Sequence, residues 1–112
     1  MLRVHTKKFG ASVILCLQGR IVSGETTALR KAVDSQAGIN TVVLDLARVS
    51  TVDAGGLGLM LELREQTQSK GIEFKLMNVT RLVSRVLEIT GLNSVFEVTS
   101  GAGGAVSLGV GG

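Results

Sequence analysis

The chain is poor in the side chains on which disulfides and metal clusters depend. Cys16 is the single cysteine, so no intramolecular disulfide can form, and we expect a cytoplasmic protein. One histidine, one cysteine and three aspartates leave little material for a structural metal cluster. We therefore predict no metal ion.

Catalytic motifs are missing as well. His5 is the single histidine, and no serine or cysteine stands in a nucleophile-elbow pattern. Cys16 alternates with apolar neighbours in a strand pattern, which predicts a buried, unreactive thiol. The glycine-rich patterns that bind nucleotide phosphates have no match. The sequence therefore predicts a protein that is not an enzyme and that carries no cofactor.

Aromatic residues are scarce. Tryptophan and tyrosine are absent and three phenylalanines remain, so platforms for stacking nucleic-acid bases are lacking. The 12 lysines and arginines exceed the 9 acidic residues and give a net charge of +3, but they are scattered along the chain. We expect an ordinary, slightly basic surface and no nucleic-acid partner.

Long apolar runs are absent too. The longest, residues 13–17, is far shorter than the ~20 residues of a membrane-spanning helix. Lys7 and Lys8 precede it as in a signal peptide, but no small-residue cleavage site follows. We expect neither a secretion signal nor direct insertion into a membrane.

What remains is the composition of one globular domain, with 112 residues of which 45% are hydrophobic and 19% charged. Apolar patterning predicts five strands, at residues 4–8, 12–18, 41–46, 72–77 and 95–98. A loop is predicted at residues 47–52. The later alternation of strand and helix favours an α/β fold with a mixed or mostly parallel sheet.

Three helices are predicted between these strands. The first has Ser23 as its N-cap and ends before Gly38, and the second follows Asp53 as its cap. The third begins at Thr80 and ends at Gly91 in a left-handed conformation. Its predicted packing side contains Leu82, Val83, Val86, Leu87 and Ile89.

The C-terminal segment has a different composition. Residues 99–112 contain six glycines, no charge and no aromatic side chain. Ordering glycine is entropically costly, and little apolar area is present to offset that cost. We predict a flexible, glycine-rich tail after a domain of residues 1–98, the alternative being an extra edge strand at residues 105–108.

The most unusual stretch is residues 52–58, Val-Asp-Ala-Gly-Gly-Leu-Gly, at the junction of a strand and the second helix. Glycine in a helix costs about 1 kcal/mol relative to alanine, so the cluster needs a reason. In one interpretation, these small residues let the helix start press against a neighbouring backbone. In the other, they leave a smooth surface on which a partner docks, with helix N–H groups pointing outward.

Residues 42–46, Val49 and residues 52–58 together resemble the signature of STAS domains, the family of the bacterial anti-sigma factor antagonists. The similarity continues through residues 17–21, 75–78, 86–92 and 95–96, and so covers about residues 2–98. It implies a single mixed β-sheet of about 4–5 strands with helices mainly on one face. It also implies partner switching, in which the antagonist binds an anti-sigma factor that is a serine kinase, and phosphorylation ends the binding.

The sequence departs from this family's pattern at the phosphoacceptor. The resemblance places the phosphorylated serine directly after the signature aspartate or one position further on, which here are Ala54 and Gly55. Neither carries a hydroxyl, so neither can be phosphorylated. Ser50 or Thr51 could substitute. Val22 replaces an acidic residue that sporulation-type antagonists often carry near their partner, which leaves the exact partner open.

The leading hypothesis is a non-catalytic STAS protein that binds an anti-sigma factor kinase and is not phosphorylated at the usual site. An accessory subunit of a lipid or anion transport system is the alternative, and a small-ligand binder is a third hypothesis. The oligomeric state is left open, a homodimer included. The predicted partner-binding residues are Ser23, Gly24, Ser50, Thr51, Asp53, Ala54, Gly55 and Gly56.

Overall fold

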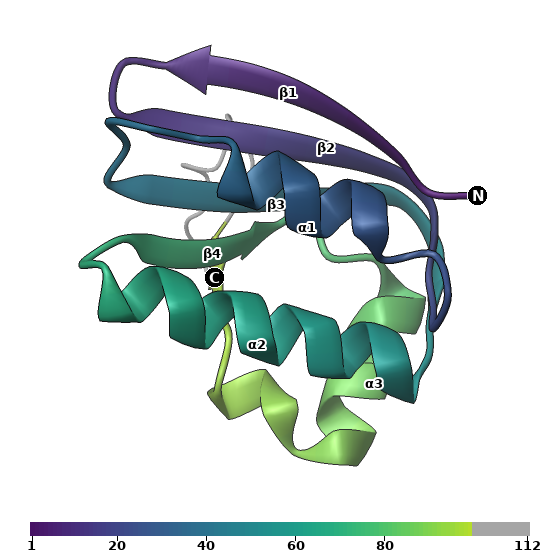
Figure 1. Cartoon of the computed structure of the whole chain (residues 1–112). Helices are drawn as coiled ribbons and strands as arrows, with labels where there is room; N and C mark the ends of the chain where they lie inside the picture. The colour runs from purple at the N-terminus through teal and green to yellow at the C-terminus, as the bar shows by residue number, and fades with distance from the viewer. Residues whose placement is uncertain (100–112) are drawn as a thin grey trace.

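A computed structural model of the chain describes residues 1–99 and shows one five-stranded sheet packed against helices (Figure 1). The strands are β1 (Arg3–Phe9), β2 (Ser12–Ile21), β3 (Thr41–Val52), β4 (Glu73–Met77) and β5 (Glu97–Thr99). The helices are α1 (Thr27–Asp34), α2 (Ala54–Ser69) and α3 (Arg81–Thr90), and a short 3-10 turn, η1 (Leu92–Ser94), precedes β5. The predicted order of strands and helices is confirmed.

The strands follow one another across the sheet in chain order, β1-β2-β3-β4-β5. β1 is antiparallel to β2, and the other neighbours are parallel. α1 and α2 lie side by side on one face of the sheet, and α3 packs at the end of β3 (Figure 1). The predicted single mixed sheet is therefore confirmed.

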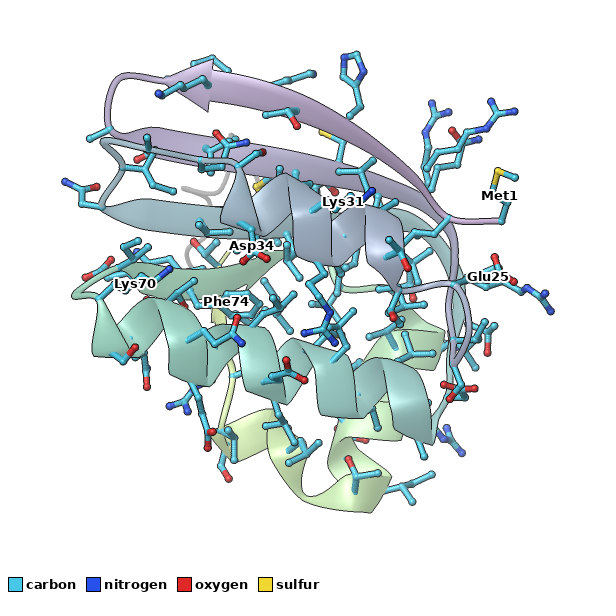
Figure 2. All side chains as sticks on the ribbon, in the orientation of Figure 1. Met1, Glu25, Lys31, Asp34, Lys70 and Phe74 are labelled. Atoms are coloured by element: carbon cyan, nitrogen blue, oxygen red, sulfur yellow. The ribbon has the colours of Figure 1, made fainter. Side chains whose placement is uncertain are left out.

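The hydrophobic core lies between the sheet and the helices. Alternate residues of β2, namely Val13, Leu15 and Leu17, are almost fully buried, whereas Ile14 and Cys16 between them are half-buried. Figure 2 shows Phe74 of β4 in the layer beneath α2, where it is buried. The alternation follows from the pleat of a strand, which points successive side chains to opposite faces. Among residues 1–99, no helix covers the second face of the sheet (Figure 1).

Ser23 is not the N-cap of the first helix. That cap is Thr26, whose side chain makes no capping hydrogen bond, and α1 ends at Asp34 rather than continuing to Gly38. The backbone N–H of Ser23 is instead held by the carboxylate of Asp53, 30 residues away in sequence. Gly24 then adopts a φ of +88°, which turns the chain before a helix can begin.

The predicted loop at residues 47–52 is also wrong, because β3 continues to Val52. β2 runs on to Ile21, beyond its predicted end at residue 18, and pairs with this part of β3. Two register shifts in that pairing interrupt the regular alternation of apolar residues. The extension places the end of β3 directly against the end of β2.

Two assignments near the C-terminus change as well. Leu82 and Ile89 of α3 do not join the core, since they are 51% and 79% exposed, whereas Val83 and Leu87 are buried. The last strand is Glu97–Thr99, and its Thr99 pairs with Met77 of β4. The remainder of the predicted tail, residues 100–112, lies outside the described residues. Within residues 1–99, no helix has the length and hydrophobicity needed to cross a membrane.

Candidate partner-binding site

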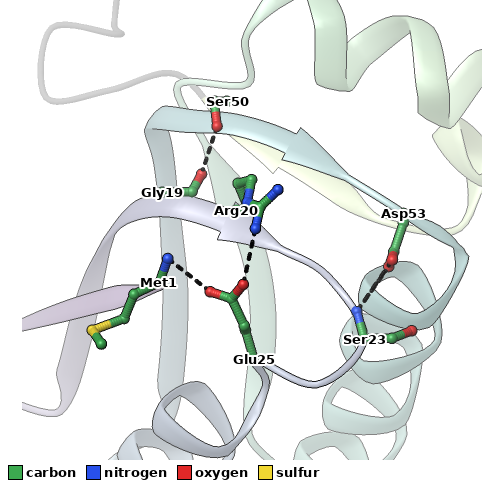
Figure 3. Close-up of polar contacts among 7 residues, drawn as sticks. All are labelled: Met1, Gly19, Arg20, Ser23, Glu25, Ser50 and Asp53. Carbon is green, nitrogen blue, oxygen red and sulfur yellow. Dashed lines mark hydrogen bonds and ion pairs between the residues drawn. The ribbon is translucent and has the colours of Figure 1, made fainter.

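The junction between β3 and α2 is organised by the carboxylate of Asp53. Its extended backbone and its side chain form the N-cap of α2, with Oδ1 accepting the N–H of Gly56 at 2.8 Å. The backbone N–H of Ser23 donates to the same carboxylate, at 3.1 Å from Oδ1 and 3.2 Å from Oδ2 (Figure 3). One side chain therefore joins the end of β3, the start of α2 and the loop between β2 and α1.

These hydrogen bonds also fix the charge at the junction. The backbone N–H of Gly56, followed by those of Ser23 and Gly55, lowers the pKa of Asp53 below its ordinary value, because each stabilises the carboxylate. Partial burial opposes this effect without cancelling it. Asp53 is therefore an anion at neutral pH. Its negative charge also suits the N-terminal end of a helix.

The glycines at the junction serve close packing. A methyl group at residue 56 would stand 1.8 Å from the backbone oxygen of Ile21, and Gly56 is buried. At residue 55 it would stand 1.8 Å from the Oγ of Ser23. Gly58, by contrast, is exposed and has no atom within 4 Å of that position. The close-packing interpretation is therefore confirmed for Gly56, which lies against the backbone of β2, and is wrong for Gly58. Gly55 lies closest to the side chain of Ser23 in the loop between β2 and α1.

The structure divides the predicted partner-binding residues into groups. Ser23, Asp53, Gly55 and Gly56 are joined by the contacts above, and Gly24 follows Ser23 in the same loop. The exposed members of the predicted set are Ser23, Gly24, Ser50, Asp53, Ala54 and Gly55. The exposed part of the junction is a small surface with few large side chains.

Ser50 and Thr51 lie in β3 rather than in a loop. The hydroxyl of Ser50 donates to the backbone oxygen of Gly19 in β2 at 3.2 Å (Figure 3). Thr51 is half-buried and pairs with Arg20 in the parallel ladder. Within residues 1–99, neither hydroxyl forms a hydrogen bond with Asp53, so Ser50 and Thr51 belong to the sheet beside the carboxylate cluster and not to the cluster itself.

A second charged cluster, which the sequence did not reveal, borders the Ser23 loop. Glu25 accepts from the N-terminal amine of Met1 at 2.8 Å and from Arg20 at 3.1 Å (Figure 3). The hydrogen bond from the N-terminal amine, together with the contact from Arg20, lowers the pKa of Glu25. Arg20 lies five residues before Glu25. Met1 is distant in sequence and is brought close by the pairing of β1 with β2, so no local pattern could identify its contact with Glu25.

The helix-free face of the sheet holds a broad hollow of about 820 Å³. Cys16 lines it, so the prediction of a buried thiol is wrong, and its Sγ lies 4.0 Å from Oδ2 of Asp45. Asp45 also accepts from Asn78 at 3.1 Å and from the N–H of Ala47 at 3.0 Å. No group of three or more candidate ligand side chains within residues 1–99 could hold a metal ion.

The sequence is similar to a known domain family and to a bacterial regulator. The sequence model of the STAS domain matches residues 3–104. BtrV of Bordetella bronchiseptica, named as a candidate anti-sigma factor antagonist, is 30% identical over 101 residues, which are 88% of this chain and 87% of BtrV.

Solved structures show the same architecture. A candidate anti-sigma factor antagonist of Thermotoga maritima, TM1081, superposes with a TM-score of 0.81 and 24% identity over 91% of this chain and 90% of its own. The anti-sigma factor antagonist SpoIIAA in its unphosphorylated form gives a TM-score of 0.74 and 18% identity over 92% and 93%. The phosphorylated form of SpoIIAA from Bacillus gives 0.69 and 17% over 92% and 96%.

The same fold also occurs in a protein of a transporter family. A sulfate transporter family protein of Wolinella succinogenes superposes with a TM-score of 0.71 and 21% identity, over 79% of this chain and 75% of its own. At that identity the similarity concerns the fold alone.

Proposed function

The chain belongs to the STAS domain family, and from that premise we propose that it is a non-catalytic antagonist that binds an anti-sigma factor of the serine kinase type. In this proposal the protein acts in the cytoplasm, and its binding releases the sigma factor that the kinase holds. The exposed surface around Asp53 is the docking site.

The observation that carries the proposal is the Asp53 carboxylate, which holds the Ser23 loop and the first turn of α2 in one arrangement. A docking surface gains affinity when its parts are ordered before the partner arrives, because less conformational entropy is then lost on binding. The exposed residues around this carboxylate include Gly24, Ala54 and Gly55, which have no bulky side chains to prevent close approach.

The similarity to BtrV supports an antagonist because it extends over most of both chains. A subunit of a transport system is the second candidate, and the Wolinella succinogenes protein favours it. The identity and coverage of the Wolinella succinogenes protein are lower than those of BtrV, so the transport subunit is the weaker candidate. Both candidates use the fold as a binding module, and both leave catalysis to other proteins.

The proposal is tested by Ala54→Arg, which places a long cationic side chain on the exposed first turn of α2. Titration calorimetry with the purified anti-sigma factor kinase of the same organism should show affinity weakened by more than about tenfold, as for a bulky group at the centre of an interface. Thermal unfolding should be nearly unchanged, because the position is exposed.

Gln68→Arg is the matched control, since it introduces the same side chain at an exposed position in the last turn of α2. It should bind as the wild type does. Equal affinity of the Ala54→Arg variant would contradict the proposed surface. Recovery of a transport protein, and no kinase, in a pull-down from native cells would favour the second candidate.

A further inference from the structure

We propose that Ser23 is the phosphoacceptor of this protein, and that its Oγ replaces the hydroxyl missing from residues 54 and 55. The inference rests on the proposed function, because a serine kinase partner supplies the phosphoryl group. It concerns a residue in the loop between β2 and α1, outside the segment in which the resemblance places the acceptor.

The Oγ of Ser23 lies against the first turn of α2. A Cβ on residue 55 would lie 1.8 Å from Ser23 Oγ and 2.9 Å from Ser23 Cβ. The side chain of Ser23 therefore occupies the space that a side chain of residue 55 would enter. The glycine at 55 and the serine at 23 are complementary, because a larger residue at 55 would displace the hydroxyl of Ser23. A hydroxyl is thus present beside the first turn of α2, although α2 does not supply it.

The hydroxyl of Ser23 is available for modification. Ser23 is exposed, and its Oγ makes no hydrogen bond within residues 1–99. The hydroxyl of Ser50 is already bonded to Gly19, and Thr51 is half-buried in the ladder between β2 and β3. Of the three hydroxyls proposed for the docking surface, Ser23 is the one that is both exposed and unbonded.

The backbone of Ser23 is held in place, while the loop around it is open to solvent. Its backbone N–H donates to both oxygens of Asp53, which fixes the residue against the start of α2. Gly24, the next residue, has no atom within 4 Å of where a Cβ would stand. A hollow of about 360 Å³ adjoins the loop and is lined by Met1, Leu2, Gly24, Glu25, Thr27 and Ala28. A kinase can therefore approach the hydroxyl from the Gly24 side.

In the transfer step, Ser23 Oγ attacks the γ-phosphorus of ATP bound to the kinase. A bond forms between Oγ and phosphorus, the bond from the γ-phosphorus to the bridging oxygen breaks, and ADP leaves. The hydroxyl proton passes to the general base of the kinase. The product adds about −1.5 to −2 charges beside the Asp53 carboxylate. A partner that covers this surface must then desolvate two neighbouring anions, so phosphorylation ends the binding.

The experiment incubates the full chain with the kinase and ATP and locates the phosphoryl group by tandem mass spectrometry. We expect one phosphoryl group, on Ser23. The Ser23→Ala variant should incorporate none, and the matched Ser50→Ala variant should be phosphorylated at the wild-type rate.

Binding supplies the second readout. Ser23→Glu should weaken kinase binding by more than about tenfold relative to Ser23→Gln, which has the same size without the charge. If the kinase binds but the phosphoryl group appears on Ser50 or Thr51, or on no residue, the Ser23 assignment is overturned and the proposed function stands. If the kinase binds none of the proteins, both fail.

Discussion

At the scale of single residues, identical amino acids at the junction have different roles. Gly55, Gly56 and Gly58 are indistinguishable in a list of residue types, and all three belong to the first turns of α2. Gly55 faces a side chain, Gly56 faces a backbone oxygen, and Gly58 faces open space. Packing explains Gly55 and Gly56 but not Gly58. We therefore expect substitutions at residues 55 and 56, and not at residue 58, to lower the stability of the fold.

Alanine substitutions test this difference directly. Gly56→Ala should lower the free energy of unfolding by about 1–3 kcal/mol or more, because its methyl group must displace the backbone of Ile21. Gly58→Ala is the matched control and should raise it by up to about 1 kcal/mol, since alanine is the better helix former. Urea denaturation measures both. Equal stability of the two variants would contradict the close approach of α2 to β2.

At the scale of elements, Asp53 connects segments that are far apart in sequence. The same carboxylate caps α2 and holds the Ser23 loop, so its ionisation is linked to the stability of the whole junction. The backbone N–H groups lower its pKa in the folded state, whereas the unfolded chain has the ordinary carboxyl value near 3.8. A group with a lowered folded pKa contributes its full stability above the unfolded pKa and loses it as the pH falls.

Asp53→Asn isolates this contribution. Asparagine can still cap a helix but carries no charge. The variant should be less stable than the wild type at pH 7, and the difference should shrink as the pH falls below about 4 towards 2. Comparing the two proteins removes the effect of Glu25 and Glu62, whose pKa values are also lowered, by the N-terminal amine and by Arg30 respectively. A difference that stays constant with pH would show that the charge of Asp53 is not involved.

The difference between local and distant contacts explains which predictions were correct. Asp53 and Thr80 were identified as caps because the signal is local: each side chain accepts from an N–H three residues ahead. The role of Ser23 depends on a partner 30 residues away, which no local pattern contains. The extension of β3 to Val52 depends likewise on the length of β2, and the register shifts hide the usual alternation.

At the scale of the whole molecule, one core supports the fold. Within residues 1–99, nearly all buried apolar residues of the sheet and of the three helices form one cluster, which includes Ile21, Val52 and Leu57 beside the junction. Helical periodicity predicted which side of α3 packs against the core. It did not predict which apolar residues on that side stay exposed. Leu82 and Ile89 flank the buried Val83 and Leu87 and are exposed, a difference that the apolar pattern of α3 alone does not contain.

Two alanine substitutions compare a buried side chain with an exposed one. Leu63→Ala in α2 should cost about 2–5 kcal/mol, because the fully buried side chain leaves a cavity. Ile89→Ala in α3 should change stability by no more than about 0.5 kcal/mol, since that side chain is 79% exposed. Chemical denaturation of both variants gives the comparison. A large loss at Ile89 would mean that the side chain is covered in solution, for example by a second copy of the chain.

The chain-order arrangement of the sheet also bears on how the protein is made. Because every strand pairs with the strand synthesised just before it, each newly translated segment meets a neighbour that has already left the ribosome. No early strand has to wait for the C-terminus. Assembly can therefore advance from β1 to β5 as translation proceeds, and each exposed strand edge waits only for the next strand of the chain.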